Sequence, residues 1–122
     1  MTDPVQGGAA TRQVRCLLAH ILRRVTFPGH DELLQQVPNI EVVGGPITML
    51  DLRVNPPAPT SPCPDGPVPG WAFVTESGRR ETGEILIWVT AGYIDCMEYA
   101  WYTDDPPTHL PSVDQVDIRH SI

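Results

Sequence analysis

The sequence predicts an α+β fold in which an N-terminal amphipathic helix packs on a mostly antiparallel sheet of four or five strands. Three observations predict it: a helical stripe of apolar residues, a series of short β-type segments after it, and a long hairpin pattern near residue 90. At 122 residues the chain fits one domain with its own core. We expect residues 1–10 to be a flexible tail and residues 11–122 to form a single domain.

The helical stripe lies between residues 14 and 25, where apolar side chains recur at intervals of three and four residues. This spacing places them on one face of an α-helix. The stripe consists of Val14, Leu17, Leu18, Ile21, Leu22 and Val25. Pro28 and Gly29 end the helix, and the acids that follow at 31 and 32 favour a short second helix, because carboxylates suit a helix N-terminus.

Five segments are typical of strands: 40–43, 47–54, 71–76, 85–90 and 93–102. In the second segment Leu50, Leu52 and Val54 share a face that should point inward. Residues 56–70 contain seven prolines, which exclude a helix or a central strand there. We expect a stiff crossover between two strands. A lid, or a ligand for an aromatic-lined peptide groove, are the alternatives.

The last two strand segments predict a hairpin over residues 85–102. Thr90-Ala91-Gly92 fits a three-residue loop that is closed by a left-handed glycine. Ile94 and Met97 can share the core face only if one extra residue lies between them, which predicts a β-bulge at Asp95–Cys96. The tail from residue 108 on either packs as an extended edge or stays loose.

Charge restricts the class of partner. The chain has a net charge of −7, and all eight basic residues are arginine. Residues 1–30 carry +3 (four arginines, one aspartate), whereas residues 31–122 carry −10 (four arginines, fourteen acids). Such a surface repels nucleic acid and anionic membranes and is compatible with a basic protein partner. Acidity that serves only solubility is the simpler alternative.

Cysteine usage and hydropathy predict a cytoplasmic protein. Cys16, Cys63 and Cys96 are odd in number and form no CxxC pair, which argues against a disulfide framework. The longest uninterrupted apolar run, residues 85–89, is far shorter than the roughly 20 residues of a membrane span. We expect no secretory signal and no membrane association.

The residues that could carry chemistry form no recognisable catalytic pattern. Cys16 and His20 have a spacing found in metal sites, but a structural zinc site needs two further ligands. Cys96 lies between Asp95 and Glu98, whose charges should raise the thiol pKa and oppose thiolate chemistry. We therefore expect no metal, no cofactor and no catalytic residue.

Aromatic and acidic side chains of the hairpin and the turn after it are the candidate binding residues. Leu86 and Trp88 lie on the strand face opposite Ile85 and Ile87, so the sheet should be apolar on both sides. The helix can cover one side, and the other needs cover from the chain itself or from a partner. The candidates are Trp88, Tyr93, Asp95, Glu98, Trp101, Tyr102, Asp104 and Asp105.

The segment GEILIWVTAGYIDCMEYAWYTDDPPTHLP, with VVGGPITMLDLRV upstream, resembles a family of small, functionally uncharacterised bacterial proteins that is commonest in actinobacteria. Its members carry a hairpin of the form ILVWVxDGYxxxLEYAW and an acidic TDEPP turn. The resemblance covers roughly residues 38–115, and Ala91 stands where the pattern usually has aspartate. It implies a fold and a bacterial origin, and no activity.

Two hypotheses of function follow. The first is a small interaction protein, most concretely an immunity-type protein that neutralises a basic toxin or nuclease. The second is a small enzyme or ligand-binding domain that uses the acids Asp95, Glu98, Asp104 and Asp105. A flat aromatic and acidic sheet face would favour the first, and a deep pocket at those acids would favour the second.

Replacing Leu18 with alanine should lower the free energy of unfolding by about 2–5 kcal/mol, because the stripe predicts a buried leucine and the change leaves a cavity. Arg12→Ala, off the stripe on the same helix, should change it by no more than about 0.5 kcal/mol. Denaturant unfolding measures both. Equal, small effects would show that the stripe is not core.

Overall fold

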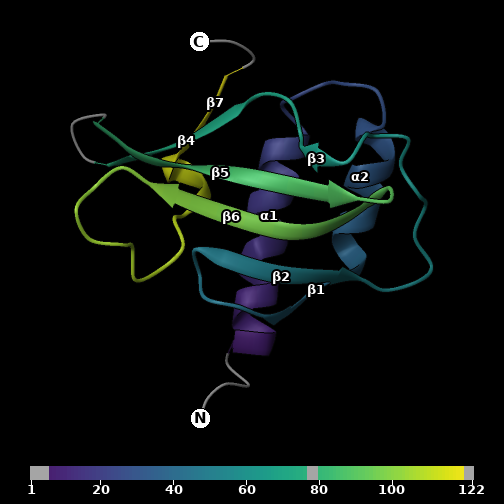
Figure 1. The fold of residues 1–122 in the computed structure, drawn as a ribbon, viewed down its shortest axis with the longest axis horizontal. Helices are drawn as coiled ribbons and strands as arrows, with labels where there is room; N and C mark the ends of the chain where they lie inside the picture. The colour runs from purple at the N-terminus through teal and green to yellow at the C-terminus, as the bar shows by residue number, and fades with distance from the viewer. Residues whose placement is uncertain (1–5, 77–79, 120–122) are drawn as a thin grey trace.

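The computed structural model describes residues 6–76 and 80–119 and shows an α+β fold, with helices on one face of an antiparallel sheet (Figure 1). The helical elements are η1 (Gln6–Ala10), α1 (Thr11–Leu22), α2 (His30–Gln36), η2 (Val37–Asn39) and η3 (Val113–Gln115). The strands are β1 (Ile40–Gly44), β2 (Met49–Val54), β3 (Gly66–Pro67), β4 (Trp71–Glu76), β5 (Arg80–Thr90), β6 (Tyr93–Trp101) and β7 (Val116–Arg119).

The described sheet has seven strands, so the expectation of four or five was wrong. Their order is β1-β2-β6-β5-β4-β7, and β3 pairs with β5 beyond the end of β4. The two strands that the sequence pattern misses are β3, inside the proline-rich segment, and β7, in the C-terminal tail. At two and four residues they are too short for an alternating pattern to reveal them.

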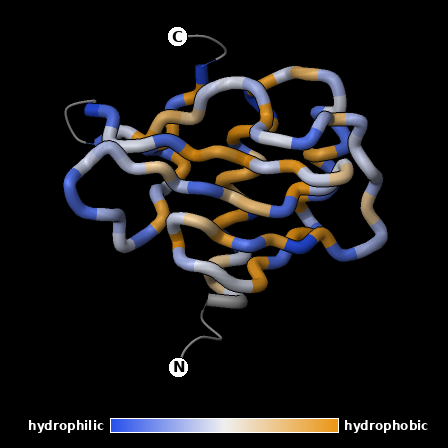
Figure 2. Tube along the Cα trace, in the orientation of Figure 1, coloured by the Kyte–Doolittle hydropathy of each residue, from blue (hydrophilic) through white to orange (hydrophobic). Residues whose placement is uncertain are grey.

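Helix α1 forms as the stripe predicts, and the stripe is the core face of the helix. Leu17, Leu18, Ile21 and Leu22 are all buried in the main hydrophobic cluster. They pack with inward-facing residues of the strands, among them Leu50, Leu52, Ile85, Ile87 and Met97. Figure 2 shows hydrophobic residues concentrated in the helices and central strands, and hydrophilic residues along the loop after β6.

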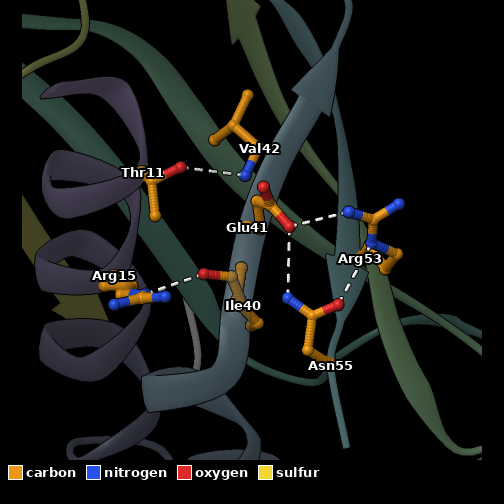
Figure 3. Close-up of polar contacts among 7 residues, drawn as sticks. All are labelled: Thr11, Arg15, Ile40, Glu41, Val42, Arg53 and Asn55. Atoms are coloured by element: carbon orange, nitrogen blue, oxygen red, sulfur yellow. Dashed lines mark hydrogen bonds and ion pairs between the residues drawn. The ribbon is translucent and has the colours of Figure 1, made fainter. Parts of the chain in front are cut away.

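Polar side chains of α1 also satisfy the two outer strands of the sheet. At β1, Thr11 Oγ1 accepts a hydrogen bond from Val42 N–H (3.0 Å), and Arg15 Nε donates to the Ile40 carbonyl (2.7 Å; Figure 3). At β7, His20 Nε2 donates to the Val116 carbonyl at 3.1 Å. One helix therefore spans the sheet and pairs backbone groups that edge strands would otherwise expose.

The β5–β6 hairpin has the predicted bulge and a different loop. Val89 pairs with Ile94 and Trp88 pairs with Cys96, so Asp95 is the extra residue, as predicted. Gly92 has the predicted left-handed conformation (φ 84°), but Thr90 pairs directly with Tyr93, so the loop has two residues and not three. Ala91 also has a positive φ (53°), as a two-residue type I′ loop requires.

Element boundaries differ from expectation in three further places. β5 begins at Arg80, ahead of the strand expected at 85–90, and residues 77–79 lie outside the described residues. Gln6–Ala10, expected as part of the tail, form a π-helical turn, and residues 1–5 lie outside the described residues. Helix α1 ends at Leu22, although Val25 of the stripe is buried as well.

The fully buried side chain of Gln36 joins α2 to the tip of the hairpin. Strand β2 leaves β6 at the Asp51–Cys96 pair, so the hairpin tip has no neighbouring strand on that side. Gln36 Oε1 accepts from Ile94 N–H (3.0 Å), and Nε2 donates to the carbonyls of Gly92 and Pro59 (both 2.8 Å). The amide thus provides the partner of the Ile94 N–H and of the Pro59 carbonyl, and a second donor to the Gly92 carbonyl.

The proline-rich segment wraps around this hairpin tip as a crossover from β2 to β4, and Figure 1 shows it passing around the end of the hairpin. Ser61 N–H donates to Gly92 O (2.9 Å), the hydroxyls of Thr60 and Tyr93 bond at 2.7 Å, and Asp65 Oδ1 accepts from Ala91 N–H (2.9 Å). Beyond the tip, β3 pairs with the other edge of β5. The proline-rich segment is therefore fixed to the hairpin by hydrogen bonds at the tip and along β5.

Gln36→Leu should lower the free energy of unfolding by about 2–4 kcal/mol, since it leaves Ile94 N–H and the Pro59 carbonyl without their partner. Its neighbour Gln35 is exposed, so Gln35→Leu is a matched control that should change stability by no more than about 0.5 kcal/mol. Urea unfolding of both variants measures the difference. Equal stability of the two variants would contradict the role assigned to Gln36.

Candidate functional site

The strand face opposite α1 and α2 is the candidate site, because no helix of the described chain lies over it (Figure 1). The pairing registers arrange its side chains in rows across the strands. One row is Asp51, Cys96 and Trp88; the next is Met49, Glu98 and Leu86; the third is Ala100, Glu84, Phe73 and Asp117. We call these residues, together with Arg53, Trp71, Glu81, Tyr102 and Arg119, the open face.

The centre of the open face is mainly apolar and contains one hydrogen bond between side chains. Glu98 lies between Met49 and Leu86 in its row, and its Oε1 accepts a hydrogen bond from Trp88 Nε1 at 3.0 Å. Trp88 and Leu86 are partly exposed, and Met49 is 44% exposed. The face therefore presents apolar surface to its surroundings, with the tryptophan held in one orientation.

Acidic groups outnumber basic groups on the open face. Arg53 pairs with Glu41 on β1 (2.8 Å), and Arg119 pairs with both Glu81 and Asp117. Hydrogen bonds from Asn55 and then Arg53 lower the pKa of Glu41, so that carboxylate stays ionised.

The remaining carboxylates of the open face have no such partner. In the part of the chain that the structure describes, no arginine or histidine forms an ion pair with Asp51, Glu84 or Glu98. Burial and then the Glu84 carboxylate raise the pKa of the Tyr102 phenol, which places Tyr102 beside Glu84. The open face thus carries negative charge that its own arginines do not neutralise.

An aromatic stack continues the open face onto β4. The rings of Trp71 and Phe73 are parallel within 1° and their centroids are 5.8 Å apart, and the Arg119 guanidinium lies 4.6 Å from the Phe73 centroid. Trp71 is 40% exposed. Sequence reasoning did not include these three residues, although the alternation of Trp71 and Phe73 along one strand could have placed them on a common face.

The structure separates the eight predicted site residues into three groups. Trp88, Glu98 and Tyr102 belong to the open face. Tyr93 and Asp95 lie at the hairpin tip and the bulge. Trp101 and Asp105 line a pocket at the end of β6, and Asp104 is exposed in the adjoining loop.

Cys96 lies on the open face and is unsuited to act as a nucleophile. Its Sγ is 3.3 Å from Met49 Sδ. Burial, followed by the charges of Asp95, Asp51 and Glu98, raises the pKa of this thiol to about 11, in the direction predicted from its acidic neighbours. At neutral pH it is a thiol and not a thiolate.

Cys16 and His20, the pair with a spacing found in metal sites, do not form a metal site in the described structure. His20 donates to the Val116 carbonyl, while Cys16 is exposed on α1. Within residues 6–76 and 80–119, no group of three or more His, Cys, Asp or Glu side chains is placed to hold a metal ion.

Residues 6–76 and 80–119 include no helix that is both long and apolar enough to cross a bilayer.

Comparison of the chain with protein-family models, with curated proteins and with solved structures finds no match in any of the three. The resemblance to the actinobacterial family stays a prediction. The function is therefore inferred from the geometry of the open face and of the pocket at the end of β6.

Alkylation of Cys96 should be slow at pH 8 and should have its midpoint near pH 11 and not near 9. A shift of this size lowers the thiolate fraction at pH 8 by about 100-fold. The measurement is the pH dependence of the iodoacetamide rate in a Cys16→Ser, Cys63→Ala variant, in which Cys96 alone remains. Adding Asp95→Asn should lower the midpoint, whereas adding the distant Asp104→Asn should not; a midpoint at 9 would contradict the assignment.

Proposed function

We propose that this chain is a small interaction protein that binds a basic protein partner through the open face. The observation that carries the proposal is an uncovered sheet face with Trp88, Leu86 and Met49 at its centre and the carboxylates Asp51 and Glu84 around them. Exposed apolar surface bordered by polar groups is typical of protein interfaces.

The side chains at the centre are those that usually dominate binding energy. Tryptophan and tyrosine are enriched among interface residues whose truncation costs most affinity. The hydrogen bond from Trp88 to Glu98 holds the ring in place before binding, which reduces the ordering that a partner would have to impose. Trp88 is thus the expected anchor of the interface.

The charge of the face favours a basic partner. Asp51, Glu84 and Glu98 have no ion pair among the described residues, so they are available to arginine or lysine side chains of another protein. Their field should speed association and should weaken as salt rises, because charges are screened beyond about 8 Å at physiological ionic strength. The same field disfavours nucleic acid and anionic membranes as partners.

Within this proposal, the most concrete biological role is that of a cytoplasmic immunity-type protein that neutralises a basic toxin or nuclease. Small size, acidity and a single extended binding face support it. Co-production of the chain with the product of the neighbouring reading frame tests this role, and relief of that product's toxicity is the expected result. Toxicity that the chain leaves unchanged would remove this role and leave the binding proposal to its own test.

The enzymatic alternative has less support, because its acids do not converge. Asp95 lies at the bulge, Glu98 on the open face and Asp105 in the pocket beyond β6. A carboxylate pair for acid–base chemistry needs both groups at one substrate. The ligand-binding version of that alternative keeps one specific observation, the pocket at Trp101 and Asp105.

Binding is tested by capture on the immobilised chain from a lysate of the source organism, followed by titration of the purified captured protein. We expect a protein of high isoelectric point, with affinity that falls as salt rises. Trp88→Ala should weaken it by at least about tenfold. The double variant Glu84→Gln, Glu98→Gln should weaken the affinity for the captured protein mainly at low salt.

The matched control is Asp31→Asn with Asp114→Asn, which removes the same charge from exposed positions away from the open face. This variant should bind like the wild type, and thermal melting should show that all variants remain folded. Capture of no basic protein, or affinity that the open-face variants leave unchanged, would overturn the proposal.

A further inference from the structure

A second candidate site lies at the far end of β6, on the other side of the sheet from the open face. It is a pocket of about 270 Å³ between the ends of β4, β5 and β6 and the loop that follows β6. Tyr99 and Thr82 are its two buried lining residues and so form its floor. Trp101 forms a wall, and Thr103 together with residues 105–109 of the loop forms the rim.

The floor of the pocket is built by a glycine that leaves room for an aromatic ring. Gly83 pairs with Trp101, and a Cβ at Gly83 would lie 3.0 Å from Cε1 of Tyr99 and 2.5 Å from the Ala100 carbonyl oxygen. The absence of a side chain at Gly83 therefore allows the Tyr99 ring to lie across β5. A side chain at position 83 would displace that ring.

Tyr99 is a buried residue that lines the pocket, and its hydroxyl has no hydrogen-bond partner among the described residues. Tyr99 is only 7% exposed, and no residue of the described chain forms a hydrogen bond with its hydroxyl, whereas the Thr82 hydroxyl is bonded to the Val74 carbonyl. Burial and then the charge of Glu76 raise the pKa of the Tyr99 phenol, which indicates that its hydroxyl end lies toward the Glu76 carboxylate. A hydroxyl at the floor of a pocket can donate or accept a hydrogen bond with a molecule that enters the pocket.

The charges around the pocket select the class of ligand. Among the described residues that line the pocket, Glu76 and Asp105 contribute carboxylates, His109 contributes an imidazole, and none is an arginine or a lysine. In the described residues neither carboxylate has an ion-pair partner. The aromatic groups of Trp101 and Tyr99 add the ring surfaces that attract organic cations.

We propose that this pocket binds a small organic cation, an alkylguanidinium or alkylammonium group, between Trp101, Glu76 and Asp105. Guanidinium suits the site best, because its plane can stack on Trp101 while its N–H groups donate to the carboxylates and the Tyr99 hydroxyl. The site is separate from the open face, so it does not depend on the proposed protein partner.

The test is a titration of the full chain with ethylguanidinium, followed by the indole N–H signals of its three tryptophans in NMR spectra. The Trp101 signal should shift saturably, and the signals of Trp71 and Trp88 should not. Ethylurea, a neutral molecule of the same shape, should bind at least about tenfold more weakly, because it forms no charge-assisted hydrogen bonds.

Variants separate this site from a general attraction of cations to an acidic protein. Glu76→Gln combined with Asp105→Asn, and separately Tyr99→Phe, should each weaken ethylguanidinium binding, the double variant by at least about tenfold. Glu98→Gln on the open face should leave it unchanged.

The proposal is overturned by any of three results: no saturable shift of Trp101, equal binding of ethylurea, or binding that the Glu76 and Asp105 changes leave intact. Where ethylguanidinium does bind, its affinity is compared with that of an arginine-containing peptide. Tighter binding of the peptide indicates a protein side chain as the source of the cation, and tighter binding of ethylguanidinium indicates a small metabolite. Because Glu98→Gln serves as the control here, failure of this site and failure of the open-face proposal are distinguishable.

Discussion

The Gln36 amide is the contact on which the arrangement of the hairpin, the proline-rich segment and α2 depends. The bulge at Asp95 and the departure of β2 leave the backbone at Gly92 and Ile94 without a neighbouring strand. Gln36 supplies both an acceptor and a donor to this backbone from inside the protein. An aliphatic side chain could fill the same volume but could satisfy neither group, so the site requires a primary amide.

The bulge that Gln36 supports also decides which side chains reach the open face. Without Asp95 as an extra residue, the alternation along β6 would reverse, and Cys96 and Glu98 would point into the core. With it, Ile94 and Met97 are both buried, and Glu98 meets Trp88 on the outer side. The acidic and aromatic character of the open face therefore follows from one inserted residue and the amide that stabilises its surroundings.

Among the described residues, the open face has no helix over it because both α-helices pack on the opposite face of the sheet (Figure 1). Helix α1 spans the sheet, buries its apolar stripe and pairs backbone groups of β1 and β7 through Thr11, Arg15 and His20. Helix α2 lies on the same side and holds the hairpin tip (Figure 1). Both helices thus pack on one face, and the outer side of β2, β6 and β5 keeps apolar residues, such as Met49, Leu86 and Trp88, that the described helices leave partly exposed.

The sequence by itself determined the features that depend on local periodicity. The 3.6-residue stripe located α1 and its buried face, the alternation in 47–54 identified Leu50 and Leu52 as inward-facing, and the break in alternation located the bulge. The acidic neighbours of Cys96 also gave the direction of its pKa. Each of these signals lies within a few residues of the feature that it predicts.

Only the tertiary structure decided the features that join distant segments. The strands β3 and β7 form because they pair with the free edges of β5 and β4, respectively. Neither segment is long enough to show an alternating hydrophobic pattern of its own. The role of Gln36 depends on groups 23 to 58 residues away, and the pocket at Tyr99 depends on Gly83, Glu76 and the loop after β6 meeting at one end of the sheet. The grouping of the candidate residues into an open face and a separate pocket was likewise set by strand order and register, which bring together residues whose separation in the chain carries no information about their separation in space.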